Sequence, residues 1–147
     1  MKLYIAYGSN LHMDQMLRRC PDAIRVGTST IQDYELLFRG NNRITGVATI
    51  EPAVGKSVPV GIWAISDRDE TFLDRYEGYP RLYKKEWFTL DLNGEKVTAM
   101  AYIMGPGHEI AAPYSRYLDT ILTGYKHFDF DPEPLLEAAR NAERSAS

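Results

Sequence analysis

Tyr7-Gly8-Ser9-Asn10-Leu11 joins two different sequence patterns near the start of the chain. The run that leads into it, Leu3 to Tyr7, is apolar, contains β-branched and aromatic residues and stops at a glycine. This is typical of a strand that ends in a turn. The segment that follows, Leu11 to Arg19, has apolar residues at helical spacing. The stretch therefore predicts a strand, a tight turn and a helix.

The turn itself has two interpretations. Ser9 and Asn10 have side-chain oxygens that accept the free N–H groups at a helix start, so we expect them to cap the helix. Backbone N–H groups converge at such a joint, and the positive end of the helix dipole adds to them. The joint is then an anion-binding site, or it is only a turn with a capped helix. The five residues alone leave both interpretations open.

Length and composition favour one globular domain. The chain has 147 residues, of which 44% are apolar, so we expect a single domain over 1–147 with 126–147 as a C-terminal tail and helix. The net charge is −3 and the basic residues are spread out, which argues against a nucleic acid or a membrane as partner. One cysteine, Cys20, and no signal-like or membrane-length apolar run predict a cytoplasmic protein.

Strand-type runs recur along the rest of the chain. The predicted strands are 24–31, 34–39, 44–50, 58–65, 83–92 and 95–103. A short link at 52–56 predicts that 44–50 and 58–65 pair with each other in antiparallel fashion. Asn93-Gly94 predicts a hairpin between the last two strands.

The predicted helices lie between and after these strands. Asp67 and Glu70 have the spacing of a capping box, and Gly78 is expected to end the helix that they begin. A second helix is expected over 113–123 with Gly124 as its stop, and a third over 133–142. Strands and helices do not alternate regularly. The sequence therefore predicts an α+β fold, with a mixed, mostly antiparallel, barrel-like sheet and flanking helices.

The sequence shows no clear motif for a metal site or for a catalytic nucleophile. His12, His108 and His127 have no partner at a familiar metal-ligand spacing, so we expect no metal site. Ser9 stands outside a Gly-x-Ser-x-Gly motif, and no His/Asp set is arranged to activate it. Cys20 has no flanking base, which predicts a buried and inert thiol.

Glu77 is the candidate for acid/base chemistry. It falls in the last turn of the helix that begins near Asp67, where the helix dipole disfavours a negative charge. The neighbouring Tyr76 and Tyr79 are expected to desolvate it further. Both effects raise a carboxyl pKa, which suits a general acid/base near neutrality. The alternative is a solvated glutamate ahead of a glycine cap.

Three blocks of the chain, taken together, resemble the γ-glutamylcyclotransferase-like (AIG2-like) family. The first is the Tyr7–Leu11 stretch. The second is Gly46-Val47-Ala48-Thr49-Ile50 followed by Pro59-Val60-Gly61-Ile62-Trp63, and the third is Leu73-Asp74-x-x-Glu77-Gly78 with Tyr83 after it. Their order and spacing match the family from about Tyr4 to Gly124.

The resemblance implies a fold, a reaction and a site. The fold is a small mixed α/β structure around a barrel-like sheet. The reaction turns a γ-glutamyl group into 5-oxoproline and releases an amino acid or amine, without metal or cofactor. The substrate is a small γ-glutamyl compound. Glu77 is the implied acid/base, and the implied substrate-binding residues are Tyr7, Gly8, Ser9, Asn10, Leu11 and Tyr83.

Some alternatives remain open at this stage. Arg39 and Arg43 are candidates to bind a substrate carboxylate, or they are solvated charges at a loop edge. The same pocket also suits a non-catalytic small-molecule binding protein or a γ-glutamyl amide hydrolase. The hydrolase would release free glutamate, whereas the cyclotransferase would release 5-oxoproline.

Overall fold

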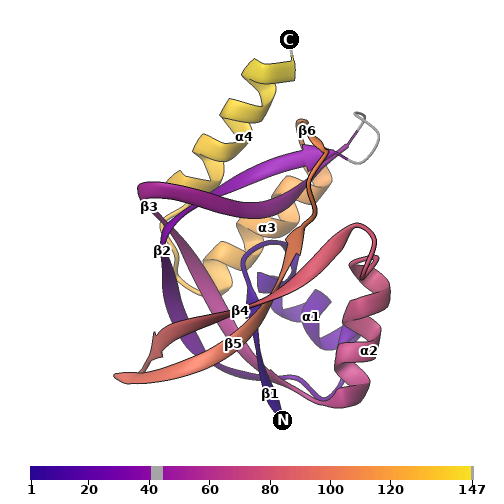
Figure 1. The fold of residues 1–147 in the computed structure, drawn as a ribbon, viewed down its shortest axis with the longest axis vertical. Coiled ribbons are helices and arrows are strands. Elements are labelled where there is room, and N and C mark those ends of the chain that lie inside the picture. Colours follow the sequence, from indigo (N-terminus) through magenta and orange to yellow (C-terminus); the bar gives the residue numbers. More distant parts are fainter. Residues whose placement is uncertain (41–44, 147) are drawn as a thin grey trace.

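A curled, six-stranded sheet forms the centre of the molecule (Figure 1). The computed structural model describes residues 1–40 and 45–146. Its elements follow in the order β1 (Lys2–Ala6), a 3-10 turn η1 (Ser9–Leu11), α1 (Met13–Arg19), β2 (Ile24–Gly40), β3 (Gly46–Ile65), α2 (Asp67–Tyr76), β4 (Tyr83–Leu92), β5 (Glu95–Met104), β6 (Glu109–Ile110), α3 (Ser115–His127) and α4 (Glu133–Ala146).

The first strand lies inside the sheet. The strand order is β4-β5-β1-β3-β2-β6, and β1 pairs antiparallel with β3 and parallel with β5. The remaining pairings among the described residues are antiparallel. The predicted α+β class, with its mostly antiparallel and barrel-like sheet, is confirmed. The central position of β1 means that the turn after it opens in the middle of the sheet rather than at an edge.

The pairing predicted between 44–50 and 58–65 is wrong. The described parts of both runs, 46–50 and 58–65, belong to β3, which pairs along its length with β2, from Ile24 opposite Ala64 to Gly40 opposite Gly46. The register shifts near Asp33, whose φ is 62°, and its carboxylate accepts a hydrogen bond from the Gly55 N–H at 2.9 Å. A β-bulge of this kind bends a strand without ending it. For the same reason 24–31 and 34–39 form one strand rather than two.

Two predicted chain reversals are confirmed. Asn93 and Gly94 have φ values of 53° and 86°, as the tight turn between β4 and β5 requires. After α2, Gly78 adopts a φ of 64°. The Tyr79 N–H then donates to the Asp74 carbonyl at 2.9 Å, which closes a Schellman motif.

The predicted helix starts need correction. In α2 the capping box is formed by Ser66 and Asp69, one residue before the predicted pair, because the Ser66 side chain can accept from the third N–H of the helix. Ser9 and Asn10 do not cap α1. His12 does so, since its Nδ1 accepts from the Gln15 N–H at 3.2 Å. The intervening 3-10 turn moves the start of α1 past the two predicted caps.

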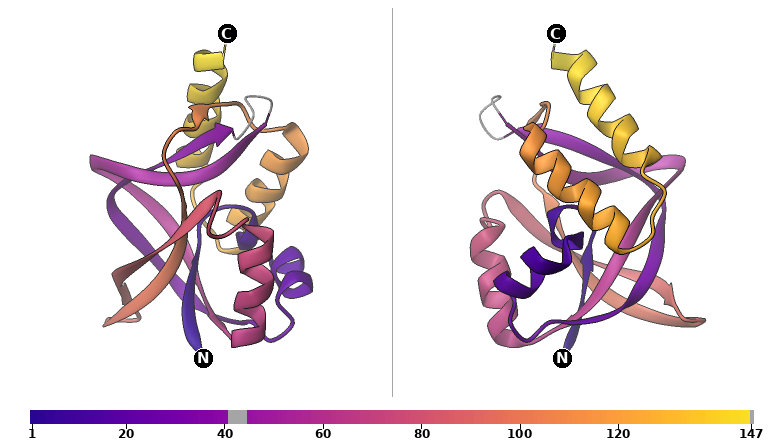
Figure 2. Two further views of the ribbon diagram at one scale, coloured as in Figure 1. Left: turned by 45° about the vertical axis from the view of Figure 1, so that its right-hand side comes forward. Right: turned by 180° about the vertical axis from the view of Figure 1, so that it is seen from behind.

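Gly124 does not end α3. It lies inside the helix, where α3 packs against η1 and the start of α1 (Figure 2). A Cβ at this position would lie 2.6 Å from the backbone of Leu11 and of His12. A glycine at this position therefore allows α3 to lie close to the backbone of Leu11 and His12. The sequence around Gly124 does not show this contact.

The core lies between the sheet and the helices that cover it. Trp63, Phe38 and Tyr125 are among its largest fully buried side chains. Cys20 is also fully buried, as predicted. In the described part of the chain, no helix is both long enough and apolar enough to cross a membrane.

Candidate active site

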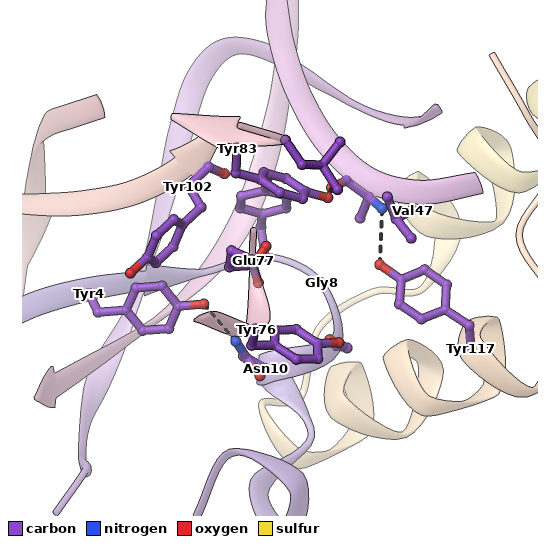
Figure 3. Close-up of a pocket in the computed structure, with 13 residues that line it drawn as sticks. Tyr4, Gly8, Asn10, Val47, Tyr76, Glu77, Tyr83, Tyr102 and Tyr117 are labelled. Atoms are coloured by element: carbon purple, nitrogen blue, oxygen red, sulfur yellow. Dashed lines mark hydrogen bonds between the residues drawn. The ribbon is translucent and has the colours of Figure 1, made fainter. Parts of the chain in front are cut away.

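A pocket opens where the turn after β1 meets the end of α2 (Figure 3). Its volume is about 200 Å³. Strands β3, β4 and β5 and helix α3 supply the other walls. The lining residues are Tyr4, Tyr7, Gly8, Ser9, Asn10, Val47, Ala48, Tyr76, Glu77, Leu82, Tyr83, Tyr102 and Tyr117.

The turn after β1 is closed by two backbone hydrogen bonds. Its internal hydrogen bonds run from the Leu11 N–H to the Gly8 carbonyl and from the His12 N–H to the Ser9 carbonyl, both at 3.0 Å. The N–H groups just before them lack an intrahelical partner by geometry, as at any helix start. Gly8 is held close to β3, since a Cβ there would lie 3.2 Å from the Ala48 side chain.

The pocket brings together most of the binding residues expected from the sequence. Tyr7, Gly8, Ser9, Asn10 and Tyr83 all line it. The remaining one, Leu11, is fully buried in the core instead, and its N–H is used inside the turn. The position of Leu11 therefore does not support the prediction that it contacts substrate. Its side chain belongs to the hydrophobic core.

Glu77 lies in the middle of the pocket (Figure 3). It is the C-terminal cap of α2, so the Schellman motif after it fixes where the carboxyl points. Burial raises the pKa of Glu77 to about 7, and the Arg19 guanidinium acts in the opposite direction. The predicted direction of the shift is thus present. The burial comes from the pocket as a whole, because Tyr79 is not among the lining residues and Tyr76 is 46% exposed.

Tyrosines form most of the polar wall. Burial raises the pKa of Tyr4, Tyr7, Tyr83, Tyr102 and Tyr117, so these phenols stay protonated at neutral pH. The charged carboxylate of Glu77 is consequently faced by neutral hydroxyl groups.

The hydroxyl groups fall into two sets. Three of them donate to protein acceptors: Tyr7 to the Tyr102 carbonyl at 2.5 Å, Tyr83 to the Ala48 carbonyl at 2.7 Å and Tyr102 to the Asp74 carboxylate at 2.6 Å. Two of them accept instead. Tyr4 accepts from the Asn10 amide and Tyr117 from the Ala48 N–H, each at 2.9 Å. These two bonds leave the O–H hydrogen of Tyr4 and of Tyr117 to serve a ligand.

Sequence reasoning missed Tyr4, Tyr102 and Tyr117 as pocket residues. The sequence placed Tyr117 only within the predicted helix 113–123, and the other two within predicted strands. The available signal was composition, since ten of the 147 residues are tyrosine. A buried phenol needs a partner for its hydroxyl, and several of them in one domain indicate a shared polar cavity.

The two arginine candidates do not gain support. Arg39 donates to both carboxylate oxygens of Glu51, at 2.5 and 3.1 Å, and to the His108 carbonyl at 2.9 Å. It does not line the pocket. Arg43 lies outside the described residues.

The histidines show one arrangement that spacing did not reveal. The rings of His12 and His127 lie edge to face, with centroids 5.1 Å apart. Each ring accepts a backbone N–H at the start of α1, from Gln15 and from Met13. Residues 1–40 and 45–146 contain no group of three or more His, Cys, Asp or Glu side chains that could hold a metal ion.

Comparisons with known proteins agree on one family. Residues 4–127 match the family model described as gamma-glutamyl cyclotransferase, AIG2-like. The chain is 30% identical over 132 residues to the gamma-glutamylcyclotransferases of Bos taurus and of Homo sapiens, and each match covers 84% of this chain and 70% of the relative.

Solved structures extend the similarity to three dimensions. A gamma-glutamyl cyclotransferase has a TM-score of 0.83 at 27% identity, over 93% of this chain and 85% of that one. YkqA from Bacillus subtilis shares the fold at 17% identity, with a TM-score of 0.80 over 97% of this chain and 54% of that one. The sequence match and the shared fold lead to the same conclusion: the chain belongs to the gamma-glutamyl cyclotransferase, AIG2-like family.

Proposed function

We propose that this protein is a γ-glutamylcyclotransferase that converts a γ-glutamyl compound to 5-oxoproline and an amino acid or amine. One observation carries the proposal: a carboxyl group with a pKa of about 7, Glu77, lies in a small pocket beside the turn Gly8–Asn10. A group that titrates near neutrality can both take and return a proton under physiological conditions. Family membership supports the reaction class.

In the proposed mechanism Glu77 first accepts a proton from the substrate and later donates it to the leaving group. Its carboxylate takes a proton from the α-ammonium group of the substrate, and the resulting amine attacks the γ-carbonyl carbon of the same molecule. The C–N bond that forms closes a five-membered ring and gives a tetrahedral oxyanion. The ring nitrogen loses its second proton to solvent, and Glu77 returns the first proton to the departing nitrogen as its bond to the γ-carbon breaks. Because both reacting atoms belong to one molecule, the pocket mainly has to fold the glutamyl chain.

Donors around Glu77 suit the negative charges of such a substrate. Gly8, Ser9 and Asn10 of the turn line the same pocket as Tyr4 and Tyr117, whose hydroxyls lie on different sides of Glu77 (Figure 3). In the proposal they hold the α-carboxylate and the oxyanion, and they do so more effectively than water because they are already oriented. A volume of about 200 Å³ lies below the usual range for drug-sized ligands, roughly 300–1,000 Å³. We therefore expect the glutamyl part to be enclosed and a large leaving group to extend outside.

The proposed reaction also implies a partner, a cofactor requirement and a location. The partner is a small γ-glutamyl molecule rather than a nucleic acid or a membrane, no cofactor takes part, and the location is the cytoplasm. These points stay predictions.

Product analysis by mass spectrometry tests the proposal. The purified protein is incubated with γ-glutamyl amino acids, γ-glutamyl amines and glutathione, in parallel with Glu77→Gln and with Glu86→Gln, an exposed glutamate on β4. We expect 5-oxoproline from the wild type and from Glu86→Gln, and none from Glu77→Gln. Free glutamate in place of 5-oxoproline would instead indicate the hydrolase. Ligand binding without any product would favour the binding protein.

A further inference from the structure

Arg19 lies behind the pocket wall and contacts two of the elements that form it. It is the last residue of α1, and its side chain is half-buried. One guanidinium nitrogen donates to the side-chain oxygen of Asn10. The guanidinium also lies over the ring of Tyr76, with its central carbon 3.3 Å from the ring centroid. Arg19 therefore links the turn after β1 to the end of α2.

The contact with Asn10 fixes which way its amide faces. An amide can rotate by half a turn and exchange its oxygen and nitrogen. Because Arg19 occupies the oxygen, the nitrogen is directed to the Tyr4 hydroxyl, to which it donates at 2.9 Å. Tyr4 and Asn10 both line the pocket. The chain of bonds from Arg19 through Asn10 thus determines that Tyr4 acts as acceptor there and keeps its own hydrogen for a ligand.

The contact with Tyr76 affects the residue next to it, Glu77. Arginine stacks on aromatic rings through its planar guanidinium, and the attraction is stronger when the pair is partly desolvated. The Tyr76 hydroxyl in turn lies 3.4 Å from the Ser9 hydroxyl, and both residues line the pocket. Holding Tyr76 in this place keeps Glu77 and the turn in a fixed relation.

Arg19 is also the positive charge that acts on Glu77. The other ionisable groups facing Glu77 are phenols: Tyr4 and Tyr7 from the first strand and turn, Tyr83 from β4, Tyr102 from β5, Tyr117 from α3 and Tyr76 from its own helix. Lys85 on β4 is paired with Asp74 at 3.0 Å and with Glu70 at 2.7 Å, and its Nζ lies 5.9 Å from the ring centroid of Tyr102. Arg19 opposes the effect of burial on the Glu77 pKa.

We propose that Arg19 is a positioning residue of this site, which directs the Asn10 amide, holds the Tyr76 ring and supplies the positive charge that Glu77 experiences. The inference rests on the proposed cyclotransferase function for its kinetic part only. Arg19 touches neither substrate nor the reacting atoms. It acts through Asn10, Tyr76 and the electrostatic potential.

Two variants separate these roles. Arg19→Gln removes both the charge and the planar fork, so we expect KM to rise about tenfold and the acidic limb of the kcat/KM profile to move to higher pH. Arg19→Lys keeps the charge but loses the fork and the stacking surface, so we expect the raised KM with an acidic limb close to that of the wild type. Arg18→Gln is the matched control, because it removes an exposed cation from the same turn of α1. We expect it to match the wild type in both respects.

A carbon-13 NMR titration of the Glu77 carboxyl makes the test independent of turnover. The pH at the midpoint of the Glu77 titration should be higher in Arg19→Gln than in the wild type and in Arg18→Gln. Equal midpoints would overturn the electrostatic role, and an unchanged KM in both Arg19 variants would overturn the positioning role. If Arg19→Gln does not fold, Arg19→Lys decides, since a wild-type KM in it overturns the proposal. A wild type that titrates as expected but makes no 5-oxoproline would refute the proposed function and leave the assignment of Arg19 intact.

Discussion

Tyr83 and Tyr117 bind the two backbone polar groups of one residue, Ala48. The Tyr83 hydroxyl donates to the Ala48 carbonyl at 2.7 Å, and the Tyr117 hydroxyl accepts from the Ala48 N–H at 2.9 Å. The two tyrosines come from β4 and α3, so the pocket side of β3 is held from two elements that are distant in sequence.

Removing the hydroxyl of Tyr117 should therefore affect both stability and catalysis. Tyr117→Phe leaves the Ala48 N–H without its acceptor, and we expect the free energy of unfolding to fall by about 1 kcal/mol. It also removes a donor from the pocket, so KM should rise. Denaturant unfolding and steady-state kinetics measure the two effects. The exposed Tyr114, one turn earlier, provides the control, and Tyr114→Phe should change neither quantity.

The rate should depend on the ionisation of Glu77. Its pKa is about 7, and the carboxylate is the form that accepts the substrate proton. We expect kcat/KM to rise with pH through about 7 and to reach a plateau above it. A profile measured from pH 5 to 9, with a substrate whose own groups titrate outside this range, checks the point. A rate that is already constant from pH 5 upward would show that Glu77 is not the base.

The same ionisation predicts how stability varies with pH. The folded pKa of about 7 lies above the ordinary 4.5, so the unfolded chain loses this proton first as the pH rises. The contribution of Glu77 to the free energy of unfolding is thus intact below about pH 4.5 and is lost as the pH rises to 7. Glu77→Gln removes the cost of burying this charge, so we expect the variant to be more stable than the wild type at pH 8, on the order of 3 kcal/mol. The difference should disappear near pH 4, and thermal unfolding at both pH values tests this.

The cap of α2 offers a test of helix stability. The Ser66 hydroxyl accepts from the Asp69 N–H at 3.1 Å and donates to the Asp22 carboxylate at 2.7 Å. Ser66→Ala loses both bonds and should lower the free energy of unfolding by about 1 kcal/mol. Asp67→Asn changes the residue that the sequence pattern favours as the cap, and it should have a much smaller effect. Equal losses in the two variants would contradict the observed cap.

At Gly124, the sign of the stability change caused by an alanine substitution tests the packing of α3. Glycine to alanine inside a helix ordinarily stabilises it by up to about 1 kcal/mol. At Gly124 the added Cβ would lie 2.6 Å from the backbone of Leu11 and His12, so one of the two segments has to shift. We expect Gly124→Ala to be destabilising by roughly 1–3 kcal/mol and to lower activity, because α3 carries Tyr117. Asp119→Ala on the exposed side of the same helix should be close to neutral.

Local patterns predicted the elements around the site well. The strand before Gly8, the Asn93-Gly94 hairpin and the glycine after Glu77 each depend on a few adjacent residues, so the sequence was enough to locate them. Glu77 was found in the same way, as the end of a helix. Its raised pKa was expected from the helix dipole and two neighbouring tyrosines, whereas in the structure burial in the whole pocket is the main cause.

Features that depend on distant contacts were not accessible from sequence. The pairing of 46–50 with β2, rather than with 58–65, is a contact between segments that no local pattern specifies. The bulge at Asp33, which keeps β2 one strand, is likewise not indicated by a polar residue in a strand pattern. Gly124 looks the same as a helix stop until the backbone of Leu11 is placed against it. The pocket tyrosines lie on β1, the turn after it, α2, β4, β5 and α3, and no local pattern places such residues together.

The central place of β1 has a consequence for folding kinetics. Tyr4 lies opposite Trp63 on one side and Met100 on the other, so both pairings close long stretches of chain. Contacts of such high sequence separation form slowly, because the entropy of loop closure is lost before the contacts stabilise the structure. The pocket needs this strand, both of its neighbours and α3 at once. Recovery of catalytic activity after dilution from denaturant should accordingly coincide with the last folding phase, and partly folded chains should have no residual activity.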